Sequence, residues 1–269
     1  MGFIEILYAE TRFVWAGLLR RKSALFTALL YPYILTAFVI LVGSTMGSPQ
    51  LFVVRVGIEP VPFFIVSSFM LMSIMGVVDD IFWKPLFDEF MGTLPYVIAS
   101  PVDRVLYFVA LPLPRLIIVL FIGLSSVLPV MIMYYGVAGV YEAVVVMLLA
   151  GFGALVFATL AMCITGALYI AGGETWRSLN VIRPLLMVLL GVFYPRWLMP
   201  LTAQYLSWAL PPSHVVEAVH RMLAETTGNA VQYFVLLGVA TALAILYAPI
   251  GSTSIRAWER KKLREGISV

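Results

Sequence analysis

Apolar runs of about 20 residues recur along this chain, and they restrict its possible folds more than any other feature. A helix of that length crosses a hydrocarbon core of roughly 30 Å. Hydrophobic residues make up 62% of the 269 residues and charged residues only 12%. Soluble domains carry charge on about a quarter of their residues. The sequence therefore predicts an all-α polytopic membrane protein that forms a single transmembrane domain over residues 1–269.

Six transmembrane helices are predicted, the fifth of them short. Between spans five and six, residues 197–210 and 213–223 are too short to cross a bilayer, so we expect two re-entrant or interfacial half-helices. In the fourth span, Ala150, Ala154 and Ala158 lie with Gly151 and Gly153 on a small-residue face that favours close helix packing. The predicted spans are roughly 23–43, 61–78, 107–135, 143–170, 184–194 and 230–250.

Residues 1–22 are predicted to form an amphipathic helix in the membrane interface. Ile4, Tyr8 and Trp15 fall on one helical stripe, whereas Glu5 and Arg12 lie opposite. A plain extension of the first span is the alternative. With residues 1–22 as an interfacial helix, the six-span core covers residues 23–250, and residues 251–269 form a basic tail.

The distribution of positive charge predicts that both termini are cytoplasmic. In that orientation the cytoplasmic segments hold 13 of the 17 Lys and Arg residues, and Arg115 lies at the inner rim. The outer segments hold only Arg55, Arg196 and Arg221, in agreement with the positive-inside rule. A counter-ion role inside the bundle is the alternative for Arg115. Because the basic residues flank membrane spans, nucleic acid is not an expected partner.

A polar stretch from Asp79 to Leu106 separates the second and third spans and contains all four aspartates of the chain. Pro85, Pro95 and Pro101 are expected to divide it into short helices, because proline lacks a backbone donor. Ser100 is predicted to cap a helix whose first residue is Pro101, with Asp103 at the third position. We interpret the stretch as a cytoplasmic contact site for another protein; an ordinary solvated loop is the alternative.

Motifs for catalysis are weak in this sequence. It lacks the Walker A pattern GxxxxGK[ST], HExxH and GxSxG, so no catalytic, cofactor-binding or metal-binding residue is predicted and the chain is not expected to be an enzyme. Asp79 and Asp80 lack the second acidic cluster that a magnesium–diphosphate site needs. His214 and His220 are six residues apart, which makes a weak zinc case. We expect them to be polar residues of a wet half-helix.

Two segments of the chain resemble the permease subunits of type-2 ABC exporters. Residues 92–104, GTLPYVIASPVDR, resemble the family pattern GTLExLLxSPVxR that follows the second span. The segment from Tyr194 to Arg221 resembles YPxxxLP…NPLTxxVEAxR before the last span. The order of elements also agrees with the family. Pro95 replaces a glutamate, Leu210 replaces an asparagine, and residues 88–91 keep only part of a charged E-R-E run.

This resemblance implies the membrane-spanning subunit of an ATP-driven exporter in the cell membrane of a prokaryote. A homodimer would form the substrate pathway, and two separate ABC ATPase subunits would supply ATP and magnesium, so this chain itself would hold no cofactor. Rival interpretations are a non-transporting membrane anchor or assembly subunit, an ion channel, and an exporter of lipid-linked polysaccharide instead of a small lipophilic or amphiphilic compound. The residues implied for ATPase coupling are Glu89, Gly92, Thr93, Leu94, Ser100, Pro101 and Arg104, and those of the re-entrant region are Tyr194, Pro195, Pro200, Pro211, Glu217 and Arg221.

Overall fold

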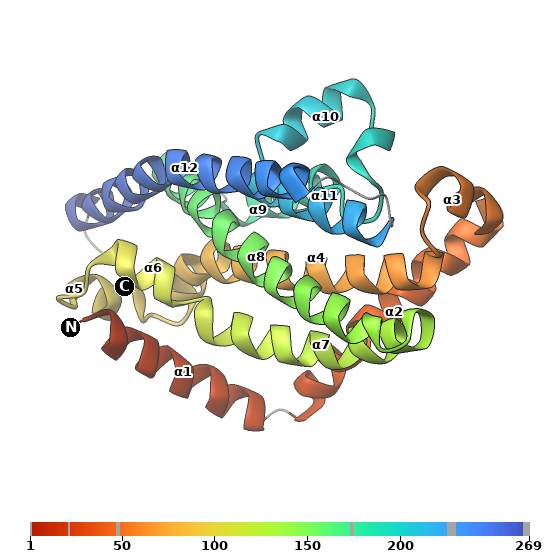
Figure 1. Cartoon of the computed structure of the whole chain (residues 1–269). Helices are drawn as coiled ribbons and strands as arrows, with labels where there is room; N and C mark the ends of the chain where they lie inside the picture. The colour runs from red at the N-terminus through yellow and green to blue at the C-terminus, as the bar shows by residue number, and fades with distance from the viewer. Residues whose placement is uncertain (1, 21, 47–48, 173–174, 225–229, 266–269) are drawn as a thin grey trace.

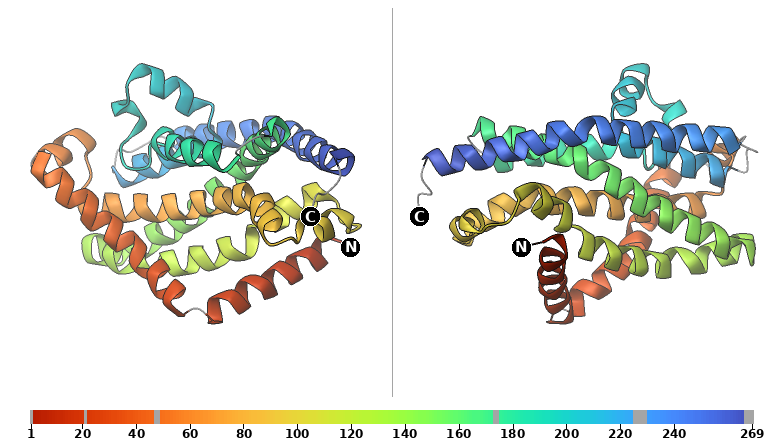
Figure 2. Two further views of the ribbon diagram at one scale, coloured as in Figure 1. Left: turned by 180° about the vertical axis from the view of Figure 1, so that it is seen from behind. Right: turned by 60° about the vertical axis from the view of Figure 1, so that its left-hand side comes forward.

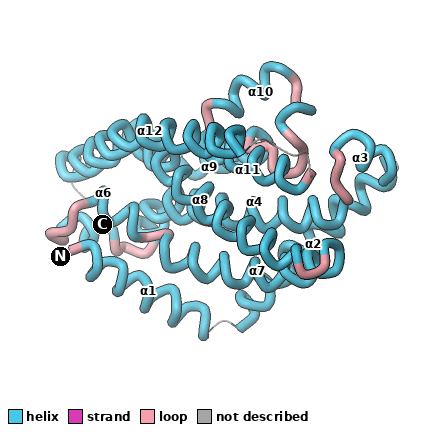
Figure 3. Tube along the Cα trace, viewed as in Figure 1, coloured by secondary structure: helices cyan, strands magenta, loops and turns pink. Residues whose placement is uncertain are grey.

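The computed structural model describes the chain except residues 1, 21, 47–48, 173–174, 225–229 and 266–269. All regular structure within the described residues is helical, joined by short loops (Figure 3). Arg21 and the last four residues of the predicted basic tail lie outside this part. The helices are α1 (Phe3–Arg20), α2 (Lys22–Met46), α3 (Pro49–Val56), α4 (Pro60–Phe90), α5 (Leu94–Ala99), α6 (Arg104–Ala110), α7 (Leu113–Tyr135), α8 (Ala138–Ala171), α9 (Thr175–Leu189), α10 (Leu201–Trp208), α11 (Pro211–Leu223) and α12 (Ala230–Glu265), with a 3₁₀ turn, η1, at Arg196–Leu198.

Helix α4 forms the centre of the bundle. It packs against α2, α7, α8, α9 and α11, and its residues from Phe63 to Phe82 are almost all buried (Figure 1). A helix that is apolar on every side is stable only where other helices or lipid surround it. The last helix, α12, packs along α8 and α11 on one side of the bundle. Both termini lie at one end of the bundle, called here the terminus end; the α7–α8 turn and α3 lie at the opposite end (Figures 1 and 2).

Five helical segments among the described residues are long and apolar enough to cross a membrane. These segments establish the chain as a polytopic helical membrane protein. The predicted fifth span, residues 184–194, overlaps only the second half of α9, whose 15 residues extend about 22 Å, less than the roughly 30 Å hydrocarbon core. The five segments are Leu25–Ser44, Pro60–Phe90, Arg104–Tyr135, Ala138–Ala171 and Val231–Arg264.

The polar stretch departs from its prediction in two respects. Helix α4 does not end near Val78 but continues through Pro85 to Phe90, since Pro85 is buried and packing stabilises the helix despite the missing donor. The predicted cap is also wrong. Asp103, not Ser100, caps the next helix, and its carboxylate accepts hydrogen bonds from the backbone N–H groups of Val105 and Leu106. Pro101 keeps Ser100 extended, so Ser100 ends α5.

Small residues bring the long helices close together, as predicted for the fourth span. Ala150, Ala154 and Ala158 of α8 are buried. A further close approach lies outside this face: a Cβ at Gly166 of α8 would collide with Ser254 of α12. This contact explains how α12 lies along α8 with little space between their backbones.

The segments expected at the membrane surface differ in their environment. Helix α1 lies along the side of the bundle with Ile4, Tyr8 and Trp15 exposed, which suits an interfacial helix whose apolar stripe faces lipid. Helix α10 projects from the bundle (Figures 1 and 2). The prediction that helix α11 is wet is wrong. His214 and His220 are buried because α11 packs between α8, α12 and α4.

We predict that the two ends of the bundle lie on opposite sides of the membrane. In a Cys163→Ala background, Tyr96→Cys at the terminus end should react with a membrane-impermeant maleimide only after the cells are permeabilised. Val137→Cys, in the turn at the opposite end, should react in intact cells. Both side chains are well exposed within this chain, at 78% and 88% respectively, and labelling after permeabilisation shows that each introduced cysteine is accessible. Labelling of Tyr96→Cys in intact cells would contradict the cytoplasmic placement of the termini.

Candidate functional site

The candidate site lies at the terminus end, where the segment between α4 and α6 meets the end of α12. We call residues 88–104 the coupling segment. It contains the end of α4, the short helix α5 and the cap of α6, and it lies beside the last turns of α12 (Figure 1). Next to it, the rings of Phe108 and Tyr169 each pack edge to face against Trp258, with ring centroids 6.1 and 6.0 Å apart. The coupling segment therefore rests on a buried aromatic cluster that joins α6, α8 and α12.

Arg104 holds the coupling segment together. Its guanidinium donates to the backbone carbonyls of Ile98 and Ser100 at 2.8 and 2.9 Å, and to the Ser100 hydroxyl at 3.1 Å. Its Nε lies 2.7 Å from the carboxylate of Glu259 in α12. Only 3% of Arg104 is exposed. A fully occupied, buried guanidinium acts inside the chain, so Arg104 can transmit a displacement of the coupling segment to α12 but offers no surface to a partner.

Two further ion pairs join the coupling segment to α12. Arg256 lies 3.1 Å from Asp103, and Lys262 lies 3.3 Å from Glu89. These pairs are exposed and individually contribute little to stability. Each of the three α12 residues Arg256, Glu259 and Lys262 therefore lies beside a residue of opposite charge in the coupling segment.

A tight turn sets the direction of α5. Gly92 has a φ of +67°, a left-handed conformation that favours glycine. The Thr93 backbone N–H donates to the Asp88 carbonyl at 2.8 Å, and its hydroxyl donates to the Asp88 carboxylate at 3.0 Å. Asp88 is buried and also pairs with Lys84 at 3.1 Å. Leu94 is buried under this turn, so Thr93 and Leu94 are structural members of the coupling segment.

The outward face of the coupling segment is apolar despite its charged surroundings. Phe90, Met91 and Tyr96 of this segment are exposed, as is Phe87 just before it; Phe90 and Tyr96 are 78% exposed. Large exposed apolar side chains at the end of a membrane-crossing helix are typical of a surface that contacts a protein or the membrane interface. None of these residues is among the predicted site residues, although aromatic residues within an acidic stretch were an available signal.

Ion pairs also link α4 to its neighbours just above the coupling segment. Asp79 accepts from Arg183 of α9 at 2.7 and 2.8 Å, and Asp80 pairs with Arg115 of α7. Glu10 of α1 lies beside this group, and burial raises the pKa of its carboxyl. Asp79 and Asp80 thus join different helices. Arg115 pairs with Asp80, but its side chain is 51% exposed, so it is not the counter-ion inside the bundle that we considered as its alternative.

At the opposite end, Glu217 is the centre of a second charged cluster. It pairs with Arg196 of η1 at 3.0 Å and with Arg221 one turn further along α11. Arg196 and Glu217 are buried, and Arg196 also contacts His214 and Ser213 at 3.3 Å. The cluster fixes the turn that precedes α10 to the face of α11.

The proline residues of the re-entrant region start its helices. Pro195 precedes η1, Pro200 precedes α10, and Pro211 is the first residue of α11. Proline suits these positions because its fixed φ favours a helix start and no donor is needed there. The Tyr194 hydroxyl donates to the Val188 carbonyl, which folds the chain back after α9.

The two histidines do not form a metal site. His214 contacts the Trp208 carbonyl at 2.9 Å, and His220 contacts the Val192 carbonyl at 3.1 Å and stacks near Phe63. In the part of the chain that the structure describes, no three metal-ligating side chains gather. Burial lowers the pKa of His220 to about 3, so its ring is neutral at physiological pH.

Comparisons of this chain with protein-family models, with curated proteins and with solved structures gave no match. The function of the chain is therefore inferred from the geometry of the coupling segment and of the opposite end.

We predict that Arg104→Ala destabilises the protein by about 3 kcal/mol, because it leaves Glu259 and two backbone carbonyls without their buried donor. Glu259→Gln should destabilise it less, since an amide still accepts a hydrogen bond from Arg104. The control is Arg260→Ala, which removes an exposed arginine from the same helix. Denaturation of the purified protein in detergent measures all three. Equal stability of Arg104→Ala and Arg260→Ala would contradict the role of Arg104.

Acidification should destabilise the fold through His220. Its folded-state pKa lies below the ordinary value of about 6.5, so the unfolded chain binds more protons as the pH falls below that value. Between pH 7 and pH 5 the loss should be about 2 kcal/mol. His220→Gln, which can still donate to the Val192 carbonyl, should have a flatter stability profile over this range. An unchanged profile in His220→Gln, with His214→Gln as the comparison, would contradict this assignment.

Proposed function

We propose that this chain is the permease subunit of an ATP-driven exporter and that the coupling segment receives the movement of a separate ATP-binding subunit. The observation that carries the proposal is the combination of an exposed apolar face with an internally fixed framework. The face, formed by Phe87, Phe90, Met91 and Tyr96, offers a docking surface. The framework behind it, Arg104 and Glu259, connects that surface to α12.

This arrangement suits the transmission of force between subunits. A partner that pushes on α5 also displaces α6, because Arg104, the first residue of α6, donates to the carbonyls of Ile98 and Ser100 at the end of α5. The same displacement reaches α12 through Glu259 and α4 through Gly92 and Asp88. Rigid coupling is needed because a flexible loop would absorb the movement before it reached the spans.

In this proposal the topology is that of six spans with both termini in the cytoplasm. Helix α9 and residues 190–194 serve as a shortened fifth span, and α10 and α11 form the re-entrant pair that follows it. Two copies of the chain enclose the substrate pathway, and two ATP-binding subunits with magnesium lie beneath them. The family resemblance of residues 92–104 and of the re-entrant region supports this topology.

The rival function is a membrane anchor or assembly subunit without a pathway of its own. Both functions predict an ATP-binding partner, but only the exporter predicts that coupling depends on the Arg104–Glu259 connection. A reconstituted complex distinguishes them, because an anchor would leave the rate of ATP hydrolysis independent of transported compounds.

We predict that Tyr96→Ala and Met91→Asp each weaken the association of the chain with its ATP-binding subunit by at least about 2 kcal/mol, as expected for central interface residues. The chain, purified through an affinity tag from its native membranes, would be tested for co-purifying proteins that contain a Walker A sequence. Val137→Asp, which changes an equally exposed residue at the opposite end, is the matched control.

A second measurement separates docking from coupling. Glu259→Gln should leave co-purification unchanged while it lowers the stimulation of ATP hydrolysis by transported compounds. If the Tyr96 and Met91 variants retain full co-purification and remain folded, the coupling segment is not the docking surface and the proposal fails.

A further inference from the structure

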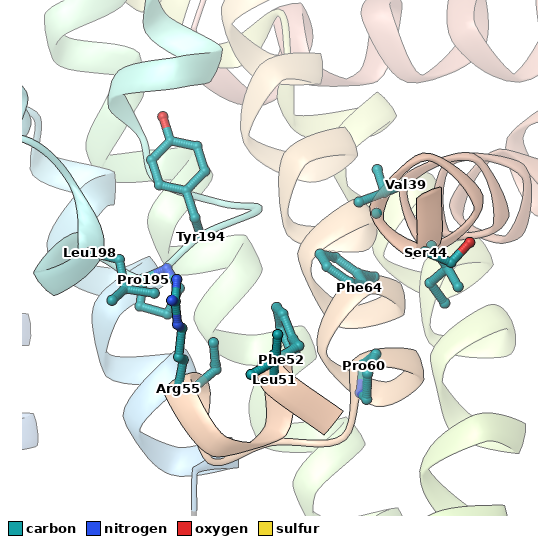
Figure 4. Close-up of a pocket in the computed structure, with 13 residues that line it drawn as sticks. Val39, Ser44, Leu51, Phe52, Arg55, Pro60, Phe64, Tyr194, Pro195 and Leu198 are labelled. Atoms are coloured by element: carbon teal, nitrogen blue, oxygen red, sulfur yellow. The ribbon is translucent and has the colours of Figure 1, made fainter. Parts of the chain in front are cut away.

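A cavity at the end opposite the termini has no role in the proposed coupling. It has a volume of about 480 Å³, within the range of pockets that hold drug-sized molecules. Four segments that are distant in the sequence enclose it: the end of α2, α3, the start of α4, and residues 194–198 (Figure 4). With the termini in the cytoplasm, the cavity opens at the outer side of the membrane.

The walls of this cavity are mostly apolar. Phe52 of α3 and Phe64 of α4 line it, and their rings lie 5.1 Å apart in one cluster with the fully buried Phe63. Val39 and Ile40 of α2 form the facing wall. A pocket of this composition binds the hydrocarbon or ring portion of a ligand through burial of apolar surface.

Arg55 is the one charged residue among the described residues that line the cavity. Its side chain extends from α3 toward Pro195 and Leu198 (Figure 4). Among the described residues, no carboxylate pairs with it. The other polar side chains of the lining already donate elsewhere: Ser44 to the Leu41 carbonyl and Tyr194 to the Val188 carbonyl. The guanidinium therefore remains as a donor for an anion beside an apolar cavity.

The surroundings of α3 give the cavity access to lipid. Val54, next to Arg55, is 81% exposed and does not line the cavity. An amphipathic helix with apolar side chains directed away from the protein is typical of the membrane interface. A ligand can then enter from the outer leaflet with its charged group at interface level.

From these observations we infer that the cavity is a binding site for an anionic amphiphile. Its apolar portion lies between α2, α3 and α4, and its carboxylate or phosphate accepts hydrogen bonds from Arg55. A cationic amphiphile does not fit, since it would bring a second positive charge beside the guanidinium. The source of such a ligand is either a lipid of the outer leaflet or the exported compound. The inference concerns binding to this chain and stands independently of the ATP-driven function.

The test uses the full chain purified in a neutral detergent and a photoreactive fatty acid with a diazirine in its acyl chain. The matched probe is the alcohol of the same chain length. We expect saturable labelling of peptides from α2 and α3 by the acid, and binding of the alcohol about tenfold weaker, the effect of losing a charge-assisted hydrogen bond.

Variants make the assignment specific. Arg55→Gln should bind acid and alcohol alike, whereas Arg55→Lys should retain most of the preference for the acid. Gly43→Leu should abolish saturable labelling, because Gly43 lines the cavity and a side chain there meets no atom within 4 Å of its Cβ. Gly238→Leu in α12 has the same freedom at its Cβ but lies outside the cavity lining, so it should label normally.

Three results would overturn the inference: equal affinity of the wild type for acid and alcohol, an unchanged preference in Arg55→Gln, or cross-links that map away from α2 and α3. Native mass spectrometry separates the two sources. A membrane lipid would be seen as an anionic phospholipid bound to the wild type and absent from Gly43→Leu. An exported compound would leave the purified protein empty, and ATP would release the bound probe in membrane vesicles. Because binding is measured without the ATP-binding subunit, failure of the docking experiment does not affect this outcome.

Discussion

The pairing of acidic residues on α4 with basic residues from other helices is the interaction on which the rest of the structure depends. Helix α4 is apolar over most of its length, but its last turns carry Asp79, Asp80, Asp88 and Glu89. Each of these acids has a basic partner within the described structure, three of them on α9, α7 and α12. A carboxylate that leaves water without a partner costs several kcal/mol. Through these pairs the central helix is connected to α7, α9 and α12 near its own C-terminal part.

The two ends of the bundle use buried charge for different purposes. At the terminus end, Arg104 binds carbonyls of its own segment and the Glu259 carboxylate, so that three helices meet at one guanidinium. At the opposite end, Glu217 forms ion pairs with two arginines and holds an irregular chain segment against α11. The first arrangement connects elements that can move together, whereas the second holds a proline-rich segment in place.

The long helices and their order were predictable, and the candidate site only in outline. Apolar periodicity and length indicated the long helices, because each must satisfy its own backbone in a medium without water. Boundaries failed where tertiary packing competes with local signals. Pro85 did not end α4, and Asp103 displaced Ser100 as a cap, because its carboxylate accepts two backbone donors. The burial of His214 and His220 was missed, since a short polar helix gives no sign of what covers it.

Sequence alone determined that this is a helical membrane protein with a polar segment between its second and third long helices, because composition and run length decide which segments can leave water. Only the tertiary structure decided how that segment is arranged. It revealed that Arg104 is internal, that Glu259 from a basic tail is its partner, and that Phe90 and Tyr96 are the side chains left outside. Partners 155 residues apart in the chain carry no local signal. The geometry of the cavity at Arg55 likewise arises from four separate segments, which only packing brings together.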